Sequence, residues 1–129
     1  MTVLIVDDDR EDIELFTDAL QAADPQVICC AATNGLDALK LITAMPVKPD
    51  MIFLDSNMPG LSGRQVMEEI QTDPILAAIP LVAWSTVWAP IKENHMKLLG
   101  ADQCLTKPSS FTQLCDDVAE LLKTHNCAA

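Results

Sequence analysis

A strict alternation of short apolar runs with longer amphipathic segments constrains this chain most. The short runs are four to six residues long and are bounded by turn-forming residues, so they indicate buried strands. The longer segments repeat apolar residues at helical spacing and indicate helices packed on one side. The predicted strands are Thr2–Val6, Val27–Ala32, Met51–Leu54, Leu81–Trp84 and Gln103–Thr106.

A helix is predicted after every strand, which gives five strands and five helices. Such alternation is typical of a parallel sheet with right-handed crossovers and helices on both faces, a doubly wound α/β fold. The third helix either closes at Asp73-Pro74 or bends into an extra turn around Ile75 to Ala78. We expect one domain over residues 1–129, with a core at 2–123 and a tail at 124–129.

Polar residues stand where the predicted strands end. Asp55 closes the most apolar run, and the carboxyl ends of parallel strands share one edge of the sheet. If the first and third strands are neighbours, three carboxylates converge there and need a cation among them. Oxygen ligands favour Mg²⁺, and a hydroxyl and an ammonium opposite suit a phosphoryl group, with an aspartate as nucleophile. The residues concerned are Asp7, Asp8, Asp55, Ser85, Thr86 and Lys107.

Charge and composition exclude several classes of function. Nineteen acidic and eight basic residues give a net charge of −11, which argues against a nucleic-acid partner. No apolar stretch is long enough to span a membrane, and the first residues do not form a signal peptide. Five cysteines without a metal-binding spacing are expected to be reduced, so we expect a cytoplasmic protein.

Together these motifs resemble the receiver domain of two-component response regulators, in its stand-alone, chemotaxis-regulator-like form. The resemblance extends from Val3 to Leu122 and implies a flavodoxin-like sheet with strand order 2-1-3-4-5. The motifs that carry it are LIVDDD at 4–9, MIFLDSNMPG at 51–60, PLVAWST at 80–86, GAD at 100–102 and LTKP at 105–108.

The resemblance implies a phosphorelay function, in which Asp55 takes a phosphoryl group from a histidine kinase or a phosphotransfer protein. It also implies that Mg²⁺ is held by Asp8, Asp55 and the backbone carbonyl of Asn57, with Asp7 acting through a water. The protein would be a signalling phosphoacceptor that assists only its own phosphorylation and dephosphorylation, and no enzyme for other substrates.

Three further residues of the resemblance concern the response to phosphorylation. Lys107 would neutralise Asp55 and later a phosphoryl oxygen, held by a peptide bond before Pro108 that is often cis in the family. Ser85 would bind the phosphoryl group and Thr86 would leave access to Asp55, or the two exchange roles if the register shifts by one residue.

The chain departs from the family pattern on the fifth strand. Cys104 stands three residues before Lys107, where the family commonly has an aromatic residue that follows the hydroxyl movement. Trp84 and Trp88 bracket the hydroxyl loop and are candidates for that part, although Trp84 is also expected as a core side chain.

Two alternatives stay open at this stage. A degenerate receiver could serve only as a docking module. A phosphatase of the haloacid-dehalogenase type also uses a strand-end aspartate, but it needs a second aspartate where this chain has Asn57. In the favoured interpretation, the output is contact with a protein target or a second copy through the face formed by helix four, strand five and helix five.

Overall fold

The computed structural model describes residues 1–55, 63–85 and 90–126. Its centre is one sheet of parallel strands in the order β2-β1-β3-β4-β5, which confirms the predicted fold class and strand order. Each strand lies within one residue of its predicted bounds. The strands are β1 (Thr2–Val6), β2 (Ile28–Ala32), β3 (Met51–Asp55), β4 (Leu81–Ser85) and β5 (Gln103–Thr106).

The described residues form six helices, so the expected number of five is corrected. The added helix is a single short one that begins at Pro74, because Asp73 caps it by accepting a hydrogen bond from the backbone N–H of Ile75. The last helix continues to Asn126, into the segment expected to be a tail. The helices are α1 (Arg10–Ala23), α2 (Gly35–Ala44), α3 (Gly63–Gln71), α4 (Pro74–Ala77), α5 (Pro90–Leu98) and α6 (Phe111–Asn126).

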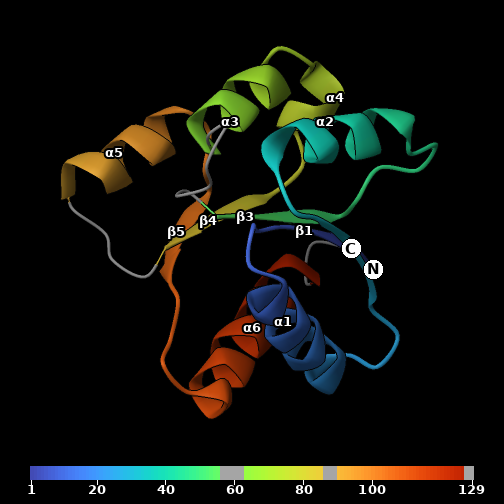
Figure 1. Cartoon of the computed structure of the whole chain (residues 1–129), viewed down its shortest axis with the longest axis vertical. Coiled ribbons are helices and arrows are strands. Elements are labelled where there is room, and N and C mark those ends of the chain that lie inside the picture. Colours follow the sequence, from blue (N-terminus) through green and yellow to red (C-terminus); the bar gives the residue numbers. More distant parts are fainter. Residues whose placement is uncertain (56–62, 86–89, 127–129) are drawn as a thin grey trace.

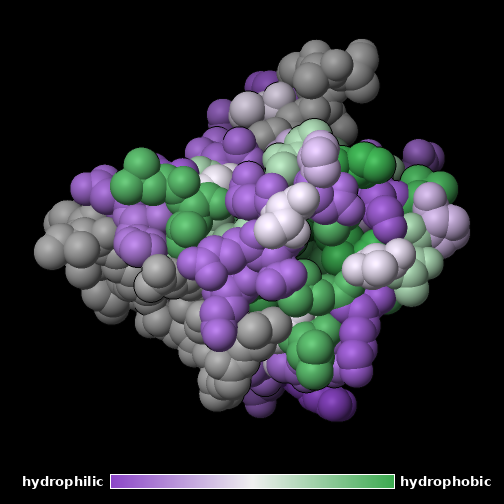
Figure 2. All heavy atoms as spheres, turned by 90° about the horizontal axis from the view of Figure 1, so that it is seen from above, coloured by the Kyte–Doolittle hydropathy of each residue, from purple (hydrophilic) through white to green (hydrophobic). Residues whose placement is uncertain are grey.

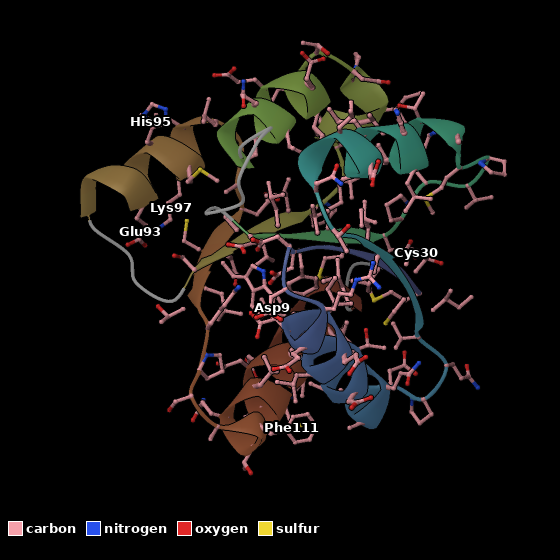
Figure 3. The ribbon with its side chains drawn as sticks, in the orientation of Figure 1. Asp9, Cys30, Glu93, His95, Lys97 and Phe111 are labelled. Atoms are coloured by element: carbon pink, nitrogen blue, oxygen red, sulfur yellow. The ribbon has the colours of Figure 1, made fainter. Side chains whose placement is uncertain are left out.

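The helices form two layers around the sheet (Figure 1). Helices α1 and α6 cover one face, and α2, α3, α4 and α5 cover the other. Asp9 caps α1 through the backbone N–H of Glu11 and stands where the chain leaves the carboxyl end of β1 (Figure 3). The start of α1 is therefore fixed beside the edge of the sheet where the polar residues gather.

Strand side chains alternate between the two layers, as the pleat of a strand requires. Odd-numbered residues of β1 and β3, such as Ile5 and Phe53, pack with α1 and α6. Even-numbered residues, such as Leu4 and Leu54, pack in the second core cluster beneath α2 and α3. Every residue of β3 and β4 is buried, so the central strands are covered on both faces.

Two aspartates connect neighbouring strands at the amino edge of the sheet. Asp50 accepts a hydrogen bond from the backbone N–H of Thr2 at 2.7 Å and donates its own N–H to the Thr2 carbonyl. Asp102 makes the same reciprocal pair with Leu81, also at 2.7 Å from the Leu81 nitrogen. We call each of these reciprocal pairs a clamp. Each clamp provides hydrogen-bond partners for the backbone N–H and C=O of the first residue of a strand.

The surface over α2, α3 and α4 mixes hydrophilic and hydrophobic residues (Figure 2). The exposed large apolar side chains of this layer, Leu36 and Ile75 among them, come from separate elements. Among the described helices, none is long and apolar enough to cross a membrane.

Candidate functional site

The candidate site begins with two aspartates at the carboxyl ends of adjacent strands. Val6 of β1 is paired with Leu54 of β3, so Asp7 and Asp55 occupy the next positions on neighbouring strands. Both continue the odd-numbered side of their strands, which faces α1 and α6. The apolar runs before them anchor the backbone, and both carboxylates are buried, Asp7 at 0% and Asp55 at 4% exposure.

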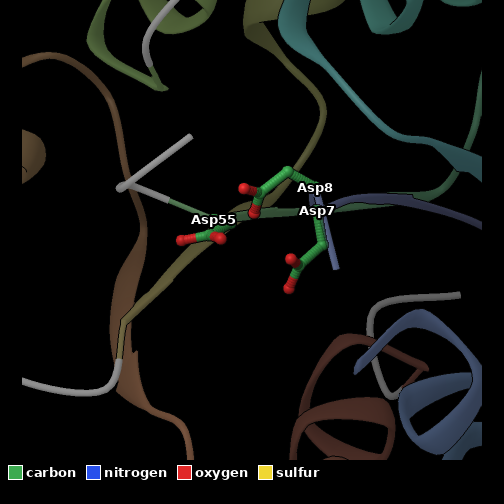
Figure 4. A group of neighbouring side chains, drawn as sticks. All are labelled: Asp7, Asp8 and Asp55. Atoms are coloured by element: carbon green, nitrogen blue, oxygen red, sulfur yellow. The ribbon is translucent and has the colours of Figure 1, made fainter. Parts of the chain in front are cut away.

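Asp8 completes a group of three carboxylates. One oxygen from each of Asp7, Asp8 and Asp55 lies within 4.8 Å of the others. Figure 4 shows the three side chains close together, with Asp8 coming from the chain just beyond β1. Asp8 is exposed, whereas the other two are buried, so the group opens to solvent on one side. An all-oxygen donor set that keeps a wet side fits a hard divalent cation such as Mg²⁺.

Lys107 reaches this group from the end of β5. Its Nζ lies 2.9 Å from Asp7 Oδ2, 3.0 Å from Asp12 Oδ2 and 3.4 Å from Asp55 Oδ2. Its backbone N–H donates to the Ser85 carbonyl at 2.8 Å, which fixes the chain beside β4. The ammonium also stands 4.8 Å from the ring centre of Trp84, a cation–π contact.

Burial and charge shift the pKa values of this site in opposite senses. Burial raises the pKa of Asp7 to about 6, although the N–H of Asp9 and the ammonium of Lys107 favour its ionised form. Burial also disfavours the charged form of Lys107, but hydrogen bonds to Asp7 and Asp12 outweigh it and raise the lysine pKa above its usual value. The lysine therefore stays charged. The negative charge of the three carboxylates that contact it exceeds its single positive charge.

Ser85 ends β4, is fully buried and pairs with Thr106 of β5. It follows Ala83, which packs on the α2 and α3 side of the sheet, and so continues the opposite face from Asp55. Asn57 and Thr86, the other two residues predicted for this site, lie outside the described residues.

Cys104 is half-buried on the same side of the sheet as Ser85. Its Sγ lies 3.9 Å from the Glu93 carbonyl of α5, and burial raises the pKa of its thiol. Glu93 and Lys97 lie on the part of α5 near β5 (Figure 3). Cys104 thus faces α5 and not the carboxylates. The peptide bond before Pro108 is trans, whereas the cis form is frequent in the family that the sequence resembles.

Asp12 was not predicted as a site residue, yet its carboxylate contacts Lys107 as closely as Asp7 does. It lies in the first turn of α1, four residues after Asp8. Asp9, two residues after Asp7, caps α1, so the first turn of this helix starts close to the end of β1. The sequence places both Glu11 and Asp12 in this first turn, and no local pattern singles out Asp12 as the partner of Lys107.

Comparisons with known proteins agree with this geometry. The sequence model of the response regulator receiver domain matches residues 3–119. The polar-differentiation response regulator DivK of Brucella anthropi is 29% identical over 121 residues, which cover 94% of this chain and 95% of DivK.

Two solved structures extend the similarity to the fold. The phosphorylated cyanobacterial phytochrome response regulator RcpA has a TM-score of 0.89 at 28% identity, covering 99% of this chain and 95% of its own. The Mn²⁺-bound form of response regulator Rcp1 has a TM-score of 0.82 at 25% identity, covering 95% and 91%. The chain therefore belongs to the response regulator receiver domain family of two-component signalling.

Proposed function

We propose that Asp55 is the phosphoacceptor of this receiver domain and that Asp7, Asp8 and Asp55 hold Mg²⁺. The observation that carries the proposal is the convergence of three carboxylates with the ammonium of Lys107 at the carboxyl ends of β1, β3 and β5. Mg²⁺ supplies positive charge that offsets the carboxylates and the phosphoryl oxygens. The backbone carbonyl of Asn57 is proposed as a further metal ligand, and Asp7 as a ligand through water.

In the proposed reaction, a carboxylate oxygen of Asp55 forms a bond to phosphorus while the bond from phosphorus to the donor's histidine nitrogen breaks. The freed imidazole nitrogen of the donor keeps the electron pair of that bond. Lys107 faces the developing negative charge on a phosphoryl oxygen, since its Nζ already stands 3.4 Å from Asp55. Ser85 and Thr86 are proposed to donate hydrogen bonds to the phosphoryl group.

The relatives support this assignment. RcpA is described as phosphorylated and Rcp1 as Mn²⁺-bound, and both cover more than nine-tenths of this chain. The family membership disfavours a haloacid-dehalogenase phosphatase. A receiver that only docks would need no lysine between its carboxylates, whereas Lys107 contacts both Asp7 and Asp55.

The proposal extends to partners and location. The phosphoryl donor is a sensor histidine kinase or a phosphotransfer protein, and residues 1–129 act as one receiver domain in the cytoplasm. The output is contact with a downstream protein or a second copy through α5, β5 and α6, which correspond to the predicted helix four, strand five and helix five. The domain catalyses only its own phosphorylation and dephosphorylation.

Incubation with acetyl phosphate and Mg²⁺, followed by intact mass spectrometry, tests the assignment. We expect an adduct of about 80 Da, the mass of one phosphoryl group. Asp55→Asn should abolish it, and chelation of Mg²⁺ should suppress it. Asp50→Asn is the matched control, because Asp50 precedes the same strand but clamps Thr2 at the opposite edge. An adduct that survives in Asp55→Asn, or none on the parent protein, would refute the proposal.

A further inference from the structure

The head group of Lys107 is held from two directions. Two of its carboxylate partners, Asp7 and Asp55, belong to the group that can hold a metal ion. The third, Asp12, lies outside that group and comes from α1 at 3.0 Å. The side chain of Lys107 is only 13% exposed, so the ammonium depends on these partners for its position.

A divalent cation and Lys107 compete for the same oxygens. The Oδ2 atoms of Asp7 and Asp55 both face Lys107, and the other oxygen of Asp7 already accepts the backbone N–H of Asp9 at 2.9 Å. A metal ion held by Asp7, Asp8 and Asp55 would offset their charge and repel the ammonium. Once that happens, Asp12 is the carboxylate that still faces Lys107 from outside the metal group.

Helix α1 also contributes to the position of the ammonium indirectly, through the ring of Trp84. Phe16, one helical turn after Asp12, packs edge-on against Trp84, with ring centres 4.3 Å apart. Trp84 in turn presents its ring to Lys107 Nζ at 4.8 Å. Residues at positions i and i+4 share one face of a helix, so Asp12 and Phe16 act on Lys107 from the same side of α1.

The side chain of Asp12 differs from the other two in its contact with water. It is 33% exposed, against 0% for Asp7 and 6% for Asp55. A carboxylate with access to solvent can follow a small movement of its partner without loss of hydration. We propose that Asp12 is a positioning residue, which retains Lys107 beside Asp55 when a divalent cation occupies the oxygens of Asp7 and Asp55. This inference rests on the proposed function of that site.

The test uses a Trp88→Phe background, in which Trp84 is the remaining tryptophan of the two in the sequence. Trp84 emission, measured in EDTA and in saturating Mg²⁺, reports on the ammonium over its ring, and Lys107→Met sets the value for complete loss of the contact. We expect Asp12→Ala to move the emission at least halfway to that value in saturating Mg²⁺ and less in EDTA, where Asp7 and Asp55 still hold Lys107. Asp12→Asn should stay near the parent value, because an amide oxygen still accepts a hydrogen bond from Lys107.

Mg²⁺ titration of the acetyl phosphate reaction gives the second measurement. We expect Asp12→Ala to raise the half-saturating Mg²⁺ concentration about tenfold, the order of one charge-assisted hydrogen bond. Asp12→Asn should raise it about threefold, since the bond persists without the charge. Glu11→Gln is the matched control, because it removes one charge from the same helical turn, and it should change the value less than about twofold.

Two results would overturn the inference: parent-like emission and Mg²⁺ dependence in Asp12→Ala, or equal effects in Asp12→Ala, Asp12→Asn and Glu11→Gln. Equal effects would mean that only net charge matters. Thermal unfolding checks that each variant folds. If the alanine variant does not fold, the Mg²⁺ dependence of Asp12→Asn against that of Glu11→Gln decides, and equal values would overturn the inference. If the parent protein forms no adduct, the proposed function fails, while the comparison of Trp84 emission in Mg²⁺ and in EDTA still tests whether Asp12 holds Lys107.

Discussion

At the amino edge of the sheet, Asp50 and Asp102 each exchange two hydrogen bonds with one neighbouring strand, whereas at the carboxyl edge several aspartates share Lys107. The clamps need no further partner for the backbone N–H that they bind, because each carboxylate accepts a hydrogen bond from it. The carboxyl edge instead holds more negative charge than its lysine offsets. Aspartates that flank strands therefore stabilise the sheet at one edge and leave charge available for a cation at the other.

The largest expected effect comes from removing the cation at the carboxyl edge. Lys107→Met should lower the free energy of unfolding by about 3 kcal/mol in EDTA near neutral pH, because it leaves buried carboxylates without a counter-charge. Saturating Mg²⁺ should restore most of this loss. Urea denaturation in both conditions measures it.

The control for this variant is Lys97→Met. Lys97 pairs with Glu93 at 3.2 Å on the surface of α5, with half of its side chain exposed. We expect a loss below about 0.5 kcal/mol there. Equal losses for the two lysine variants would contradict the view that the carboxyl edge depends on its buried cation.

The next effect concerns Asp7 and pH. Because burial raises the pKa of Asp7 from 3.8 to about 6, the folded state binds more protons than the unfolded state between these values. The stabilisation from the protonated carboxyl is complete below about pH 4 and is lost as pH rises through 6. The amide of Asp7→Asn does not ionise, so this variant does not lose that stabilisation as the pH rises. In EDTA, its stability relative to the parent should rise by about 2 kcal/mol between pH 4 and 7.5.

Urea denaturation at a series of pH values measures this difference. With saturating Mg²⁺ the rise should shrink, because a bound cation favours the ionised form of Asp7 in the parent protein. A stability difference that stays flat with pH in EDTA would contradict the buried environment assigned to this carboxyl.

The smallest effects belong to the amino edge. Asp102→Ala should cost about 1.5 kcal/mol, because the N–H of buried Leu81 loses its acceptor. Asp50→Ala should cost about 0.5 kcal/mol, since its hydrogen bond to Thr2 is exposed to water. Both variants should keep the parent's yield of acetyl phosphate adduct. Chemical denaturation gives the stability order, and a loss of adduct in either variant would show that the two edges are not independent.

Much of the fold followed from local patterns in the sequence. Apolar runs and helical spacing placed all five strands, because central strands such as β3 are buried on both faces and need continuous apolar residues. At Asp73-Pro74 the sequence is compatible with either the end of a helix or a further turn. The four residues of α4 are too few for periodicity to decide, and the cap by Asp73 becomes visible only in the structure.

Part of the site was equally predictable and part was not. Asp7 and Asp8 follow β1, Asp55 ends β3 and Lys107 follows β5, so the shared edge of a parallel sheet brings them together. The contact of Asp12 with Lys107 depends on the angle at which α1 leaves β1, which no local pattern specifies. Strand alternation predicts that Cys104 and Lys107 lie on opposite faces of the sheet. Which helices pack on each face is known only from the structure.

That alternation makes the site sensitive to the length of the chain before it. Asp55 faces Lys107 because it follows Phe53 by two residues and Met51 by four on the α1 side of β3. One residue inserted within β3 would turn the Asp55 carboxylate toward α2 and α3, whereas two would return it to the first side. Apolar exchanges inside the strand leave this orientation intact. Related sequences can therefore exchange one apolar residue for another within β3, but they must conserve the number of residues in it.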